Sequence, residues 1–168
     1  PDEHKEVVAG REFWLGHLEG REVVVVLSRI GKVAAATTAT LLADRYRVEE
    51  LLFTGVAGGL GERVRVGDVV VADALLQHDL DASPIFPRWE VPLYGRSRFQ
   101  PDAAMNARLQ AAATSVLAQA GDHLGADGLA AFGIAAPAVH AGLIVSGDRF
   151  VSTAGESTAL RVALPDAL

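Results

Sequence analysis

The sequence predicts an α/β fold with a mainly parallel sheet, and three observations support this. Short apolar runs with the length of buried strands recur along the chain. Alanine- and leucine-rich stretches typical of helices lie between them, which is the order of strand–helix–strand units. Half of the 168 residues are hydrophobic, enough for one domain with a sizeable core, and no internal repeat or second domain is visible.

Composition and charge narrow the class of protein. The net charge is -6 without a basic cluster, which disfavours nucleic acid as a partner. No apolar run approaches the roughly 18 residues of a membrane span. Cysteine is absent, which excludes disulfides and thiolate metal sites. We expect a cytoplasmic globular protein without nucleic-acid or membrane partners. The chain starts at Pro1 rather than Met, and we expect both of its ends to be incomplete.

The amino-terminal part is predicted to contain a hairpin and a helix. Residues 1–11 are polar and charged, which indicates a loop or a frayed edge. Residues 13–18 and 22–27 are predicted strands joined at Glu19-Gly20. The second of them holds a run of valines typical of strands buried on both faces. Residues 33–46, rich in alanine and leucine, favour a helix.

Two further strands are predicted next, and glycines follow the first of them. Residues 51–53 have the length of a buried strand, and almost every side chain in residues 54–59 is small or absent. Glycines allow a tight turn or a close approach of the backbone, which at the carboxyl end of a parallel strand usually serves a ligand. Residues 69–72 form the next predicted strand, after a turn at residues 66–68.

Residues 77–99 form a long, irregular and aromatic segment that contains Phe86, Trp89 and Tyr94. Loops of this length are commonly functional or interfacial, and the aromatic side chains argue against disorder. We expect this segment to lie at a dimer interface and to reach the neighbouring subunit's pocket. The alternative is a flap packed on its own core.

The carboxyl-terminal part is predicted to contain two helices and a strand. Residues 101–120 form the first helix, and residues 121–137 have a glycine- and alanine-rich composition compatible with mobility. Residues 139–145 form another core strand, and residues 152–164 form the last helix.

A series of glycine-containing motifs follows in a defined order: IGKVAA at residues 30–35, TGVAGGL at 54–60, VGDVV at 66–70 and GLIVSGDRF at 142–150. Together they resemble the 5′-methylthioadenosine/S-adenosylhomocysteine nucleosidases of the nucleoside phosphorylase superfamily, from about Phe13 onward. The resemblance implies a nucleoside phosphorylase-like fold with a mixed central sheet flanked by helices, and a homodimer. It also implies hydrolysis of the N-glycosidic bond with release of adenine, and neither a metal nor an organic cofactor.

The resemblance also implies substrate-binding residues. Phe150 matches the aromatic residue that stacks on adenine, and Val151 matches the residue whose backbone reads the adenine edge. Val56, Ala57 and Gly58 match the loop that lies beneath the ribose. Ile30 matches an apolar residue beside the 5′ substituent. The family's water-activating glutamate, ribose-binding Met-Glu pair and adenine-protonating aspartate correspond to positions before residue 1 or after residue 168. No catalytic residue is therefore assigned within this chain.

Several polar residues have simpler interpretations than catalysis. Asp148 and Asp68 are interpreted as turn residues. The side chains of His78, Asp79 and Asp81 could be metal ligands, but a structural loop is favoured. His140 is expected at the surface or as a capping residue, and Lys32 and Arg149 are expected as solvated charges or ion pairs.

Alternative functions stay open. A phosphorylase of the same superfamily commonly has an arginine two residues before the first glycine of the second motif, where this chain has Phe53, which cannot bind phosphate. Hydrolysis is therefore favoured over phosphorolysis. A hydrolase of another nucleoside, such as futalosine, and a non-catalytic nucleoside-binding remnant are the remaining alternatives.

Overall fold

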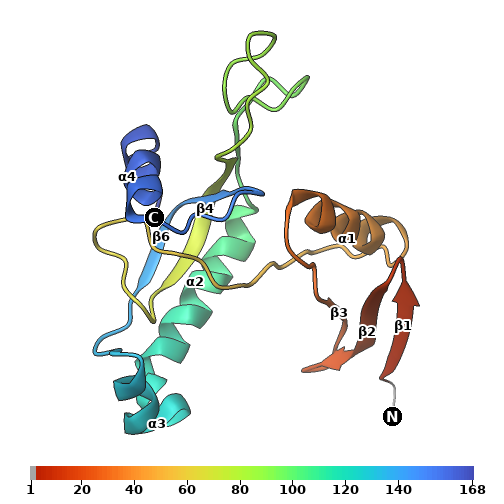
Figure 1. Cartoon of the computed structure of the whole chain (residues 1–168). Coiled ribbons are helices and arrows are strands. Elements are labelled where there is room, and N and C mark those ends of the chain that lie inside the picture. Colours follow the sequence, from red (N-terminus) through yellow and green to blue (C-terminus); the bar gives the residue numbers. More distant parts are fainter. Residues whose placement is uncertain (1–2) are drawn as a thin grey trace. The chain divides into compact units, whose positions relative to one another are not determined.

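A computed structural model describes residues 3–168, and the chain divides into two compact units, Pro1–Val56 and Ala57–Leu168. Each unit has its own sheet, of order β1-β2-β3 in the first and β5-β4-β6 in the second (Figure 1). The start of the predicted loop, residues 1–2, lies outside the described residues.

The first unit is an antiparallel meander followed by a helix. Strand β1 (His4–Val8) pairs with β2 (Arg11–Leu18), and β2 pairs with β3 (Arg21–Val26). The predicted hairpin is confirmed, since Glu19 and Gly20 both adopt positive φ, 50° and 75°, as a tight two-residue turn requires. The loop prediction is wrong for residues 4–8, because main-chain pairing with β2 makes them an edge strand, where charged side chains are common.

The helix α1 (Lys32–Asp44) confirms the next prediction, and the buried side chains of this unit belong to β2 and α1. The Phe13 ring is fully buried and lies 4.8 Å from the ring of Tyr46 between centroids. The Nε of Arg11 donates to the Thr38 hydroxyl at 2.8 Å. Strand β3, in contrast, is not covered on both faces in this unit, since Val25 is 59% exposed.

Residues 51–60 differ from the prediction. The expected buried strand at residues 51–53 is wrong, because these residues pair with no strand among residues 3–168, and Phe53 is 72% exposed. An apolar run becomes a strand only when a neighbouring strand accepts its main-chain hydrogen bonds.

The second unit is built on a mixed sheet. Strand β4 (Val69–Gln77) pairs in parallel with β6 (Val139–Ser146) and antiparallel with the short β5 (Arg98–Phe99). Both long strands confirm predictions, and β4 extends beyond the predicted residues. Beyond β6, Ala167 forms a parallel bridge with Leu143.

The helices of the second unit are α2 (Ala103–Ala118), α3 (Ala120–Ala131) and α4 (Ala154–Ala163). The Asp102 carboxylate caps α2 by accepting from the Met105 N–H at 2.7 Å, and the Asn106 amide donates to the Ala72 carbonyl on β4 at 2.6 Å. Both predicted helices of this part are confirmed. The glycine- and alanine-rich segment forms α3, kinked at Gly125 (φ 69°), because alanine favours a helix while glycine tolerates the kink.

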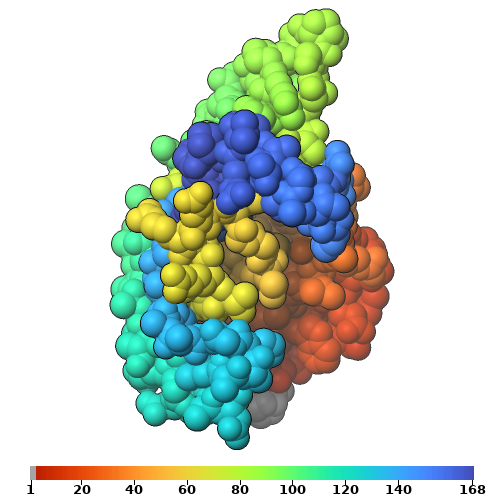
Figure 2. Space-filling view, turned by 60° about the vertical axis from the view of Figure 1, so that its left-hand side comes forward, coloured from red at the N-terminus to blue at the C-terminus, as the bar shows by residue number. Residues whose placement is uncertain are grey.

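The core of the second unit lies between the sheet and the carboxyl-terminal segment. Its buried members are Leu76, Leu143, Leu164 and Ala167, and Leu60 and Trp89 pack against them. The segment of residues 80–95 projects from the rest of its unit as a green arm (Figure 2). Trp89 is half-buried and packs against this core, whereas Ile85, Leu93 and Tyr94 on the arm are exposed.

Candidate functional site

Two turns meet at the carboxyl ends of the parallel strands β4 and β6. The last pair in the ladder is Gln77 with Ser146, so the residues that follow each strand lie next to one another. The His78 N–H extends the pairing by donating to the Ser146 carbonyl at 2.9 Å. The carboxyl edge of a parallel sheet is the usual position of a ligand site in α/β folds.

Gly147 allows the two turns to approach closely. A Cβ at this position would lie 2.6 Å from His78 Nε2 and 2.7 Å from the Asp79 Cγ and Oδ2 atoms, so a side chain here would force these neighbours to shift. Glycine is therefore favoured here by its close contact with neighbouring side chains, a contact that the sequence motif alone did not reveal.

The Asp79 carboxylate binds the main chain of the second turn. Its Oδ2 accepts from the Asp148 N–H at 2.7 Å and, over a longer 3.4 Å, from the Arg149 N–H. The preceding residue is held as well, since the Trp89 indole donates to the His78 carbonyl at 3.0 Å. The interpretation of His78 and Asp79 as parts of a structural loop agrees with these contacts.

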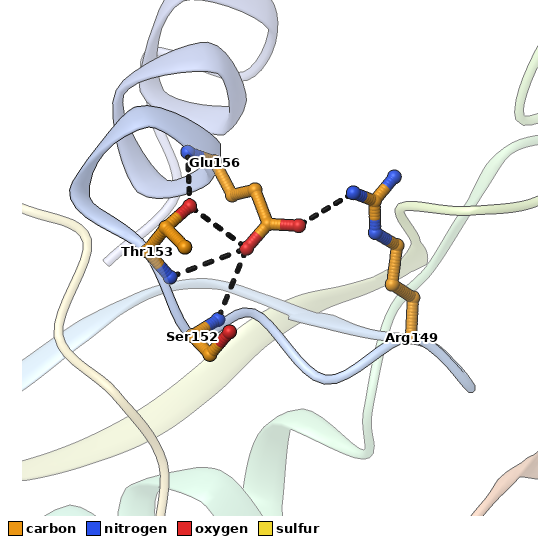
Figure 3. Close-up of polar contacts among 4 residues, drawn as sticks. All are labelled: Arg149, Ser152, Thr153 and Glu156. Carbon is orange, nitrogen blue, oxygen red and sulfur yellow. Dashed lines mark hydrogen bonds and ion pairs between the residues drawn. The ribbon is translucent and has the colours of Figure 1, made fainter.

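The Glu156 carboxylate binds the main chain three and four residues upstream of itself, at the start of α4 (Figure 3). Its Oε2 accepts from the N–H groups of Ser152 and Thr153, both at 3.2 Å, and from the Thr153 hydroxyl at 2.9 Å. The Glu156 N–H donates to the Thr153 hydroxyl at 3.2 Å, which completes a capping box. The Arg149 guanidinium pairs with the other carboxylate oxygen, which confirms its assignment to an ion pair.

These contacts favour the ionised form of Glu156. Hydrogen bonds from the Thr153 hydroxyl, the Ser152 N–H and the Arg149 guanidinium lower the pKa of Glu156 from 4.5 to about 2. The carboxylate is therefore charged throughout the physiological range and complements the positive end of the α4 dipole.

Phe150 and Val151 lie between the two carboxylate-bound segments. Phe150 is 86% exposed and Val151 is half-buried. An exposed aromatic ring followed by main-chain polar groups can stack on a flat heterocycle and hydrogen-bond its edge. Phe150 thus presents an exposed ring next to the main-chain polar groups of Val151.

The other predicted site residues belong to both units. Ala57 and Gly58 begin the second unit as irregular, exposed chain, and Leu60 anchors that stretch to the core. Ile30 and Val56 belong to the first unit, where both side chains are fully or almost fully exposed, at 98% and 105% of the reference area.

A second polar cluster lies at the opposite, amino ends of β4 and β6. The Asp68 carboxylate accepts from the N–H groups of Arg65 and Ala138 and lies 2.9 Å from His140 Nε2. The Ala138 N–H lowers the pKa of Asp68 most, with the Arg65 N–H and His140 acting in the same direction. The local bond to Arg65 agrees with a turn residue, but the expectation of a solitary surface or capping His140 is wrong.

Two further observations concern metals and membranes. Asp81 accepts from the N–H and the hydroxyl of Ser83, and no cluster of metal-binding side chains is present within residues 3–168. None of the helices in that same range has the length and hydropathy to span a bilayer.

Comparison with known proteins places the chain in a family. The model of the phosphorylase superfamily matches residues 2–166. The chain belongs to this superfamily. The α/β fold class and the resemblance derived from the motifs are thereby confirmed.

Named relatives of this superfamily member are nucleoside hydrolases. The 5′-methylthioadenosine/S-adenosylhomocysteine nucleosidase of Listeria innocua is 43% identical over 83 residues, which cover 49% of this chain and 36% of the relative. The corresponding nucleosidase of Neisseria meningitidis, solved with methylthio-immucillin-A, has a TM-score of 0.81 at 28% identity and covers 99% of this chain. The futalosine hydrolase of Helicobacter pylori has a TM-score of 0.76 at 26% identity, again over 99% of this chain.

The chain is shorter than these proteins. It spans 36% of the Listeria relative within the match. It spans 64% of the Neisseria structure and 65% of the Helicobacter structure.

The sequence analysis did not name Glu156, and it named Asp79 only as a loop residue or possible metal ligand, not as a partner of the turn before Phe150. The signal for Glu156 is local, because Thr153 followed three residues later by Glu156 is the pattern of a capping box. No comparable signal exists for Asp79, whose partners Asp148 and Arg149 lie 69 and 70 residues away in sequence.

Proposed function

We propose that the full-length protein hydrolyses the N-glycosidic bond of 5′-methylthioadenosine or S-adenosylhomocysteine. Water adds across the bond between the ribose and adenine, which releases adenine and the 5-thio-substituted ribose. The observation that carries the proposal is the exposed Phe150 at the carboxyl edge of two parallel strands, in a superfamily member whose named relatives include nucleosidases.

The proposed substrate-binding residues are those of the motifs. We assign purine stacking to Phe150 and recognition of the purine edge to the Val151 backbone. Ala57, Gly58 and Val56 are proposed to lie beneath the ribose, and Ile30 beside the 5′ substituent. We also propose that residues 1–168 form a single nucleoside phosphorylase-like domain, which the family match over residues 2–166 supports.

The reaction is tested by following adenine release from methylthioadenosine with and without phosphate. Hydrolysis predicts equal rates and free methylthioribose. A strict phosphate requirement with methylthioribose 1-phosphate as product would identify a phosphorylase instead. Release of hypoxanthine from futalosine at a higher kcat/KM would favour the function named for the Helicobacter pylori structure. A chelator should leave the rate unchanged, because the proposed mechanism uses no metal or organic cofactor.

The role of Phe150 is tested by Phe150→Ala. Loss of a stacking partner should weaken adenine binding by about fivefold, since such contacts contribute about 1 kcal/mol beyond burial. Phe132→Ala is a matched control, because Phe132 is also an exposed phenylalanine and lies at the end of α3. Equal affinities in all three proteins would remove Phe150 from the proposed site.

We also propose that the protein is a homodimer whose contact surface includes the arm of residues 80–95. The arm carries exposed Ile85, Leu93 and Tyr94, and Leu93 is 92% exposed. Exposed apolar groups of this size are commonly buried against a partner. Replacement of Ile85 and Tyr94 by serine should shift the mass in solution toward the monomer. Replacement of Trp89, which packs on its own core, should instead lower stability.

A further inference from the structure

We infer that Asp79 and Glu156 are positioning residues that hold the main chain on either side of Phe150-Val151 in the shape that binds a purine. This inference rests on the proposed function, since it concerns the same site. It assigns a role to two carboxylates that do not touch the substrate in this scheme.

The first anchor comes from the turn after β4. Asp79 binds the N–H of Asp148 at 2.7 Å, two residues before Phe150, and reaches the N–H of Arg149 at 3.4 Å. The Asp79 carboxylate lies close against the second turn, since a Cβ on Gly147 would be 2.7 Å from its Oδ2 atom. The neighbouring His78 is 9% exposed, and its main chain bonds to Ser146 and to the Trp89 indole.

The second anchor comes from the first turn of α4. Glu156 binds the N–H groups of Ser152 and Thr153, which directly follow Val151. Its other oxygen pairs with Arg149, which directly precedes Phe150 (Figure 3). Glu156 therefore contacts the segment on both sides of the two proposed purine-binding residues.

The consequence is a short span fixed at both ends. Residues 148–149 and 152–153 have main-chain N–H groups bound to carboxylates, and only Phe150 and Val151 lie between them. A binding segment that is already ordered loses less entropy when its ligand arrives, so its affinity is higher. Carboxylates suit this role because they only accept hydrogen bonds and form strong ones with N–H groups.

The test measures adenine affinity and thermal stability in the full-length protein for Asp79→Ala, Glu156→Ala and the double variant. Each single variant should raise the Kd for adenine by about tenfold, the equivalent of one charge-assisted hydrogen bond. The double variant should fall well below the product of the two effects, because a segment released at one end is already mobile. In turnover of methylthioadenosine, KM should rise while kcat changes less, as expected when ground-state and transition-state binding weaken together.

Conservative variants and a matched control separate positioning from general stability. Asp79→Asn and Glu156→Gln keep one acceptor oxygen and should recover part of the affinity. Asp68→Asn is the control, because Asp68 also binds two main-chain N–H groups, those of Arg65 and Ala138, but lies at the opposite, amino ends of β4 and β6. It should lower stability and leave the Kd for adenine unchanged.

The outcomes are distinct. Wild-type affinity in Asp79→Ala and Glu156→Ala, with adenine still bound and released by the wild-type protein, would overturn the positioning role alone. A loss of affinity in Asp68→Asn that matches its loss of stability would also overturn it, since any destabilisation would then act alike. A wild-type protein that neither binds adenine nor releases it would overturn the proposed function and this inference with it.

Discussion

Gly147→Ala tests the contact that brings the two turns together. The added Cβ would lie 2.7 Å from the Asp79 Oδ2 atom and 2.6 Å from His78 Nε2. An ordinary contact of this kind needs about 3.4 Å, so the carboxylate must retreat by about 0.7 Å. The Asp79–Asp148 hydrogen bond would then stretch from 2.7 Å to about 3.4 Å, beyond the favourable range for N–H···O bonds.

The expected cost follows from these two effects together. Overpacking of a tight contact typically costs about 1–3 kcal/mol, and the weakened charge-assisted bond acts in the same direction. We expect the free energy of unfolding in urea to fall by about 1–3 kcal/mol, and adenine affinity to fall with it. Backbone strain does not contribute, because Gly147 does not adopt a positive φ.

Gly155→Ala is the matched control. Gly155 lies in α4, and a Cβ there meets no atom within 4 Å. The same glycine-to-alanine change should leave affinity unaltered and stabilise the protein by up to about 1 kcal/mol, since alanine is the better helix former. Equal stability and affinity in Gly147→Ala and the wild type would refute the steric reasoning.

Two further predictions concern acid stability and a second glycine. Because the pKa of Glu156 falls from 4.5 to about 2 on folding, the stability that its ionised form provides is complete above about pH 4.5 and lost as the pH drops toward 2. Urea unfolding of the wild type and Glu156→Gln should therefore converge over this window; a constant difference would contradict the assignment. Gly67→Ala should destabilise by about 2 kcal/mol or more, because Gly67 has φ +94° and a Cβ would lie 2.8 Å from Ile134. Gly20→Ala, at φ +75° with open space around it, isolates the cost of the backbone conformation alone.

Local interactions explain the predictions that were confirmed. The Glu19-Gly20 hairpin needs only two residues that tolerate positive φ, and α1 and α2 follow from alanine-rich composition. The strands β4 and β6 were recognisable because their apolar runs have the length of strands. The motifs further identified the superfamily, since their order along the chain needs no knowledge of contacts.

The tertiary structure decided what depends on partners far apart in sequence. Residues 51–53 have a strand's composition but no strand to pair with among residues 3–168, whereas the charged residues of β1 form a strand because β2 offers its edge. His140 contacts Asp68, which lies 72 residues away in sequence, and Asp79 accepts a hydrogen bond from the N–H of Asp148, 69 residues away. A hydrogen bond forms where the fold brings donor and acceptor together. The sequence therefore shows that residue 79 is a carboxylate, but it does not show which main-chain N–H groups this carboxylate binds.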